Sequence, residues 1–285
     1  MAAKKFSKKE AISLGIRMTK KYFGFIFIIF LIYAAFQIIS GLLDFGAGGP
    51  ITKENIELLY KDTATANNFY KYLQEAGYIN KYGTVQAKLQ NITSVSDLVL
   101  PANLEADRNK IFIFLNAHRY RLPFPKPVFY LLTISLLVVG FIMQIGWVRI
   151  NLLLSRDQKP AVAELFSNGG LFFKFLLGSI CYILAVLGGL ILLIVPGIIF
   201  MVMLGMYPYL IVDKNMRPIE SLRASRRLTK GARWQLFWFG AVIVLFNLSG
   251  LLCLVVGLLF TIPASSIAGA YVYDQLRQQE EPAVA

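Results

Sequence analysis

Side chains that commonly carry out catalysis are scarce in this chain of 285 residues. It contains one histidine, His118, and two cysteines, Cys181 and Cys253. A histidine-based metal site is therefore excluded, and a Ser-His-Asp triad would have to use His118. No G-x-S-x-G, Walker A or H-E-x-x-H pattern occurs. We expect no enzymatic activity, no metal site and no cofactor, and we expect both cysteines to be buried free thiols.

The basic side chains, by contrast, are clustered. The segment PIESLRASRRLTK starts at Pro218, which suits the first turn of a helix on which Ile219, Leu222 and Leu228 face lipid. Each basic group near an anionic leaflet contributes about 1 kcal/mol of attraction. We therefore predict contact with anionic lipids for five residues: Arg217, Arg223, Arg226, Arg227 and Lys230. The alternative is that these charges only fix the topology.

Apolar helices must position these side chains. Hydrophobic residues make up 56% of the chain and charged residues 16%, and the formal net charge is +13. The apolar residues fall in runs of about 20, the length of a helix that crosses a bilayer. The predicted fold class is all-α, a polytopic membrane helix bundle whose partners are membrane lipids. This pattern disfavours soluble enzymes, disulfide scaffolds, disordered chains and nucleic-acid-binding domains.

Six membrane spans are predicted. The first two cover residues 22–43 and 127–154, and the next two form a hairpin over residues 171–213 that turns at Pro196 and Gly197. The last apolar stretch, residues 234–273, is long enough for two spans with a break near Gly257. A five-span arrangement with a re-entrant last segment is the alternative.

The central parts of these spans contain no ionisable residue, whereas ion-coupled transporters usually place such residues there. Asp213 and Asp274 lie at predicted span ends, where we assign them to capping or to solvation at headgroup level. Gly231 has a structural role after the basic helix. Polar side chains inside the spans are explained by hydrogen bonds between helices.

Charge asymmetry predicts the topology. Seven basic residues against Glu10 precede the first span, which places the N-terminus in the cytoplasm. The first apolar run is longer than that of a signal peptide, so we interpret it as an uncleaved span. The basic segment around Arg223 agrees with this topology, and six spans then place both termini in the cytoplasm.

Four regions follow from this topology. Residues 1–43 are a basic leader and the first span, and residues 44–126 are a mainly helical extracytoplasmic insertion. Residues 127–276 form a five-span bundle with cytoplasmic interfacial helices, before a cytoplasmic tail of residues 277–285. Within the insertion, helical spacing runs from Thr52 to Ala76 before a capping Gly77, and a second helix runs from about Ala106 to Asn116.

The bundle contains a candidate internal repeat at an offset of 61 residues. This offset pairs five positions: Ala163 with Ala224, Gly170 with Gly231, Gly189 with Gly250, Leu193 with Leu254, and Asp213 with Asp274. The run Arg17-Met18-Thr19-Lys20 before the first span also resembles Arg227-Leu228-Thr229-Lys230 before the fifth. Each unit would be an interfacial helix followed by two spans. Chance matching of apolar helices with scattered glycines is the alternative.

The region from residue 161 to residue 276 resembles a bacterial membrane family: the membrane domain of some glycerophosphodiester phosphodiesterases and its stand-alone six-span relatives. The matching residues are Pro196-Gly197, Pro208, Asp213, Ser221-Leu222, Ser225, Leu228, Lys230-Gly231, Trp234 and Tyr273-Asp274-Gln275-Leu276. The resemblance implies a bacterial cytoplasmic membrane protein, and this family has no catalytic residues of its own. The long insertion departs from the family pattern, and the chain lacks room for the phosphodiesterase domain.

Together these features favour a non-enzymatic integral membrane protein with a structural, envelope-maintenance or lipid-interacting role. The alternative is a carrier or lipid-handling transporter with a cavity between helical hairpins.

Overall fold

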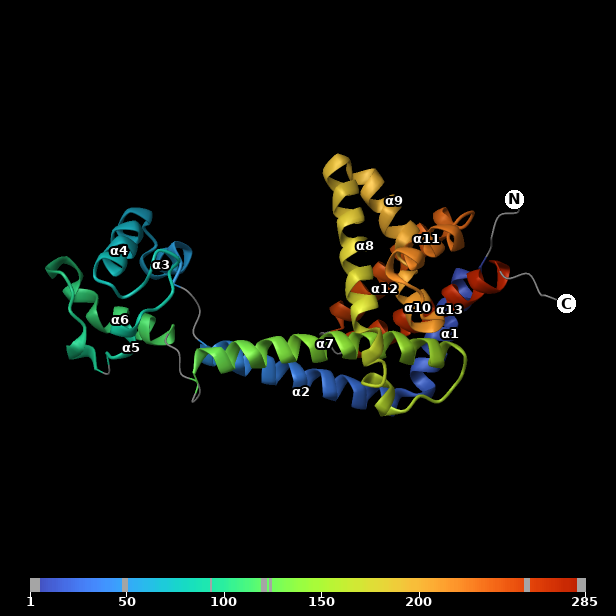
Figure 1. The fold of residues 1–285 in the computed structure, drawn as a ribbon, viewed down its shortest axis with the longest axis horizontal. Coiled ribbons are helices and arrows are strands. Elements are labelled where there is room, and N and C mark those ends of the chain that lie inside the picture. Colours follow the sequence, from blue (N-terminus) through green and yellow to red (C-terminus); the bar gives the residue numbers. More distant parts are fainter. Residues whose placement is uncertain are drawn as a thin grey trace. The chain divides into compact units, whose positions relative to one another are not determined.

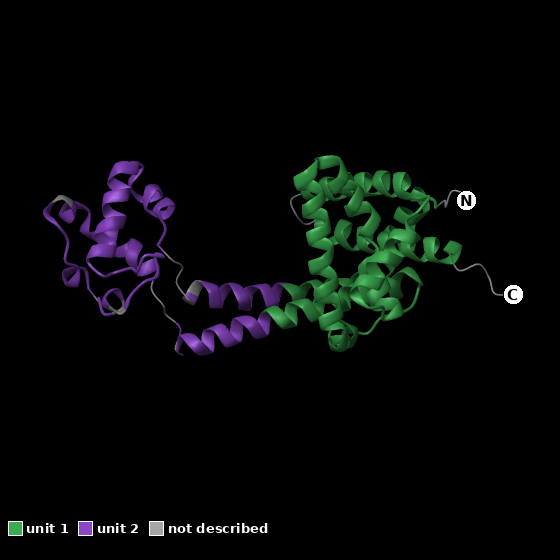
Figure 2. Ribbon diagram, turned by 45° about the horizontal axis from the view of Figure 1, so that its top comes forward, with its two compact units in different colours: residues 1–33, 137–285 green, residues 34–136 purple. Residues whose placement is uncertain are grey.

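The computed structural model of the protein describes residues 6–47, 51–92, 94–118, 122, 125–253 and 257–280. Within these residues, every element of secondary structure longer than a single bridge is a helix (Figure 1). The chain forms two compact units (Figure 2). The first comprises residues 1–33 and 137–285, and the second comprises residues 34–136. The predicted all-α class is confirmed.

Five segments among the described residues are long and apolar enough to cross a membrane, which makes this a multi-pass membrane protein. They are formed by α2 (Phe23–Ala47), α7 (Lys126–Ser155), α8 (Phe172–Leu192), α9 with α10 (Ile194–Leu204 and Tyr207–Lys214), and α12 (Arg233–Leu252). Their apolar side chains are largely exposed in the isolated protein, as expected for surfaces that face lipid.

The sixth predicted span corresponds to α13 (Leu258–Glu280), a separate helix that is not among those five apolar segments. Eleven of its residues are buried, so other parts of the protein cover much of this helix. The interfacial helix α1 (Lys8–Lys21) packs along it. At the closest approach, a Cβ atom on Gly15 would lie 2.2 Å from the carbonyl oxygen of Ala264, so only glycine fits there.

The α8–α9 hairpin turns earlier than predicted. Pro196 and Gly197 do not form the turn, because α8 ends at Leu192 and α9 begins at Ile194. Leu193 between them is extended, with φ −164° and ψ 150°. Pro196 instead lies in the first turn of α9, where its missing N–H group is not needed. Gly197 packs against Gly189, whose added Cβ would lie 2.9 Å from the Gly197 Cα atom.

The 61-residue offset also relates the helices. Phe172, where α8 begins, lies 61 residues before Arg233, where α12 begins. Gly189 packs close to Gly197, and Gly250 packs close to Gly257, at the two corresponding hairpins. The pair Leu193 and Leu254 falls partly outside the described residues.

The candidate repeat can be followed into the interfacial helices. The buried residues Ala11, Gly15, Met18 and Thr19 of α1 correspond, 210 positions later, to Ser221, Ser225, Leu228 and Thr229, which are buried on α11 (Pro218–Leu228) and at its C-cap. Helix α1 packs on α13, whereas α11 packs on α9 and α10. A third contact brings the carbonyl of Leu165 against Gly146 of α7. In each candidate repeat, the interfacial segment therefore packs on the second span of the repeat before it. The first repeat packs on the last one, through α1 and α13, so the three contacts form a closed cycle.

The insertion has its own hydrophobic core, built around Phe69, Leu73 and Tyr78. Its elements are α3 (Lys53–Tyr60), α4 (Thr63–Glu75), α5 (Ala87–Gln90), two 3-10 turns and α6 (Arg108–Ala117). The single helix predicted over Thr52–Ala76 is wrong. The helix breaks at Lys61, which is left-handed with φ 55°, and Asp62 then caps α4. Gly77, with φ 73°, ends α4 as predicted.

Candidate functional site

Helix α11 carries the predicted lipid-binding arginines, and a break in the fourth span holds it in place. Between α9 and α10, residues 205–206 leave the helical hydrogen-bond pattern. The cause is Pro208, which has no N–H group to donate to the carbonyl of Leu204. Backbone groups freed in this way must find other partners, because hydrocarbon offers none.

Two side chains of the α11 region bond to backbone groups on either side of this break. The Ser225 hydroxyl donates to the Met203 carbonyl at 3.0 Å and accepts the Met206 N–H at 3.1 Å. The Thr229 hydroxyl lies 3.1 Å from the same Met203 oxygen. Ser225 and Thr229 are fully buried. The polar Ser/Thr face of α11 is therefore fixed to the break, and this fixes the direction of the opposite, basic face.

The lipid-facing stripe predicted for α11 is only partly right. Ile219 is 58% exposed, but Leu228 is buried at 1% and Leu222 is half-buried. The reason is that α11 does not lie on the membrane surface with one whole face toward lipid. It packs into α8, α9 and α10, so Leu228 is part of the protein core.

The basic face of α11 borders a cavity of about 660 Å³ against α8. A volume of this size is typical of small-molecule and cofactor sites. On the α8 side the cavity is lined by Leu177 and Cys181. On the other side it is lined by six residues of the α11 region: Arg217, Pro218, Ile219, Glu220, Arg223 and Arg227. One wall is apolar and the other carries three guanidinium groups.

These guanidinium groups are not neutralised internally. Within the described part of the chain, Arg217, Arg223 and Arg227 make no salt bridge or side-chain hydrogen bond, and all three are exposed. Glu220 supplies the one carboxylate among the lining residues. The first turn of α11 has no side-chain cap, so its partial positive charge adds to that of the arginines. The site attracts anions.

The five predicted lipid-contact residues separate into two groups. Arg217, Arg223 and Arg227 line the cavity together. Arg226 and Lys230 are also exposed but do not line it. Gly231 lies between α11 and α12 with φ 90°, a backbone conformation that favours glycine.

No protein-family model, curated protein or solved structure matches this chain.

The resemblance to the phosphodiesterase-associated membrane domain therefore stays a hypothesis, and function must be argued from the geometry. Asp213 and Asp274 contribute nothing to the cavity, and their assignment to capping or headgroup-level solvation is wrong. Arg156 lies between the two carboxylates, with its Nη2 atom 2.9 Å from Asp213 Oδ1 and 2.7 Å from Asp274 Oδ1. Arg277 and the Tyr273 hydroxyl complete the cluster.

This ionic cluster is internally balanced, because it contains two arginines and two aspartates. The aspartate side chains are only 7% and 10% exposed. Hydrogen bonding to Asp274 raises the pKa of Arg156 above its ordinary value, so this residue stays charged. The cluster ties the ends of α7, α10 and α13 together, and we assign it to stability.

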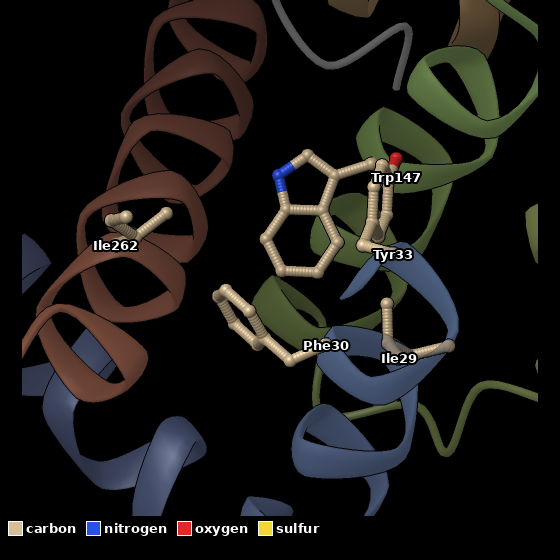
Figure 3. Close-up of a pocket in the computed structure, with 5 residues that line it drawn as sticks. All are labelled: Ile29, Phe30, Tyr33, Trp147 and Ile262. Carbon is tan, nitrogen blue, oxygen red and sulfur yellow. The ribbon is translucent and has the colours of Figure 1, made fainter. Parts of the chain in front are cut away.

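A second pocket, of about 200 Å³, lies among aromatic side chains (Figure 3). It is lined by Trp147 of α7, Ile262 of α13 and three α2 residues: Ile29, Phe30 and Tyr33. Trp147 meets Phe30 and Tyr33 edge to face. The pocket has no charged lining residue and is smaller than most ligand sites.

The remaining candidate residues do not form a site. The described residues contain no group of three or more His, Cys, Asp or Glu side chains that could hold a metal ion. His118 Nδ1 lies 2.8 Å from the carbonyl of Phe114 in the same helix. The predicted burial of the cysteines is wrong, because Cys181 is half-buried beside the basic cavity and Cys253 is exposed at the end of α12.

Proposed function

We propose that this protein is a non-enzymatic integral protein of the bacterial cytoplasmic membrane that binds an anionic lipid between α8 and α11. Both termini and α11 face the cytoplasm in this proposal, and residues 44–126 lie on the other side. The supporting arguments are the charge asymmetry of the sequence and the family resemblance.

The cavity beside α11 carries the proposal. It combines three unpaired guanidinium groups with an apolar wall from Leu177 and Ile219, which are 51% and 58% exposed. Guanidinium forks match phosphate oxygens, and exposed aliphatic side chains at membrane depth match acyl chains. A phospholipid presents both chemistries in one molecule.

The carrier alternative has less support. A carrier needs a cavity that opens in turn to each side of the membrane, whereas the 660 Å³ cavity is lined at one place by α8 and the α11 region, and the pocket among α2, α7 and α13 is about 200 Å³. Substrate-dependent flux in proteoliposomes would favour the carrier over the proposed role.

Native mass spectrometry of the full chain in mild detergent tests the proposal. We expect the wild-type protein to retain an anionic phospholipid that the double variant Arg223→Gln/Arg227→Gln loses. The matched control, Arg226→Gln/Lys230→Gln, removes the same charge from residues of the same region that do not line the cavity. Equal loss in both variants would show a diffuse charge effect and contradict a site. Hydrolysis of a glycerophosphodiester by the pure protein would contradict the non-enzymatic role.

A further inference from the structure

The charged residues that line the cavity between α8 and α11 suit some anionic lipid headgroups better than others. We infer that it takes a lipid whose headgroup carries a doubly charged phosphate, such as a phosphomonoester, in preference to the singly charged phosphodiester of ordinary anionic lipids. This inference rests on the proposed function and adds the ligand class.

The lining charges set the preferred ligand charge. Arg217, Arg223 and Arg227 contribute three positive charges and Glu220 one negative charge, which leaves a net charge of +2. A phosphodiester headgroup neutralises only half of this charge. A phosphomonoester carries about −1.5 to −2 near neutral pH, because its second pKa is about 6. It therefore neutralises nearly the whole lining.

The arrangement of the arginines suits one phosphate. Arg223 and Arg227 are four residues apart on α11, so they project from the same face of the helix. Arg217 stands at the N-cap of the same helix, next to its uncapped first turn. A phosphomonoester has three terminal oxygens to share among these donors, one more than a phosphodiester has.

The opposite wall makes the ligand a lipid rather than free phosphate. Leu177 and Cys181 are four residues apart on α8, and both line the cavity. Glycines at 178 and 189 let α8 pack tightly against Tyr207 and Gly197, and the lining residues lie outside those packed contacts. Free phosphate would leave this wall without a partner, whereas an acyl chain would cover it.

Cys181 provides a native reporter of an acyl chain at that wall. The full-length protein in neutral-lipid nanodiscs would receive 5 to 10 mol % of phosphatidic acid or of phosphatidylglycerol, or soluble glycerol phosphate. Maleimide labelling of Cys181 relative to exposed Cys253 would be followed by mass spectrometry at pH 8. We expect phosphatidic acid to slow Cys181 labelling at least fivefold more than phosphatidylglycerol does, with no protection by glycerol phosphate.

Three controls make the result decisive. Arg223→Gln/Arg227→Gln should abolish the protection, and Arg226→Gln/Lys230→Gln should retain it. Lowering the pH to 5 should remove the preference, because the phosphomonoester then carries one charge. Equal protection by the two lipids at pH 8 would refute the charge selection while leaving anionic-lipid binding intact. No protection and no retained anionic lipid would refute both, and protection by glycerol phosphate would refute the acyl-chain contact.

Discussion

The break in the fourth span makes a specific prediction about Ser225. Replacing Ser225 with Ala removes the acceptor of the buried Met206 N–H and leaves that amide without a partner. An unpaired buried amide costs about 1–3 kcal/mol. The Met203 carbonyl keeps a hydrogen-bond donor in this variant, because the Thr229 hydroxyl still lies 3.1 Å from it.

Thr229→Val should lower the free energy of unfolding by less than Ser225→Ala does, about 1 kcal/mol, because the Ser225 hydroxyl still donates to the Met203 carbonyl. In the double variant both Met203 and Met206 lose their partners, so the loss should exceed the sum of the single losses by about 0.5–3 kcal/mol. This non-additivity separates satisfaction of a shared break from two independent packing losses.

Equilibrium unfolding of the protein in mixed detergent micelles, followed by circular dichroism, would measure these free energies. Ser249→Ala is the matched control, since the exposed Ser249 hydroxyl donates only to Phe246 of its own helix, and it should change stability by less than about 0.5 kcal/mol. The reasoning is refuted if Ser225→Ala is as harmless as Ser249→Ala, or if the double variant is additive.

Three further predictions use the same measurement. Gly15→Ala should lower the free energy of unfolding by about 1–3 kcal/mol, because the added Cβ would lie 2.2 Å from the Ala264 carbonyl oxygen. Gly240→Ala, whose Cβ would meet no packing partner within 4 Å, should leave stability unchanged or raise it; equal effects of the two changes would contradict the close approach at Gly15. Arg156→Met should cost about 3 kcal/mol, because it leaves Asp213 and Asp274 with less compensation; no loss would mean that Arg277 suffices. The Lys21 hydrogen bond lowers the pKa of Asp157, so the stabilisation from this carboxylate is present above about pH 4 and is lost as the pH falls through the lowered pKa. Asp157→Asn should be less stable than the wild type at about pH 6, and this difference in stability should shrink steadily as the pH is lowered below about 4.

Local patterns in the sequence predicted much of the fold. Run length located the apolar helices, and the break near Gly257 agrees with α12 ending at Leu252 and α13 starting at Leu258. The break at Lys61 was missed although Asp62, a strong N-cap residue, marked it. Hydrophobic spacing continued through that point, and it outweighed the cap in the prediction.

Contacts between distant segments could not be predicted in the same way. Ser225 and Thr229 matter because their hydroxyl groups bond the Met203 carbonyl at the helix break, and only the packing of α11 brings these distant residues together. Arg156 went unassigned because its carboxylates are 57 and 118 positions away along the chain. The basic cluster of α11 was visible in the sequence, but the separation of cavity-lining Arg223 from non-lining Arg226 required the position of α8.

The packing of α1 on α13 affects how the protein is made. Ribosomes synthesise α1 first and α13 last, so the buried face around Ala11, Gly15 and Met18 has no partner until more than 240 further residues have been added. Contacts this distant in sequence form slowly. Until α13 has been synthesised, the buried face of α1 must therefore remain unpacked. Premature termination before α13 would leave the buried face of α1 without its packing partner.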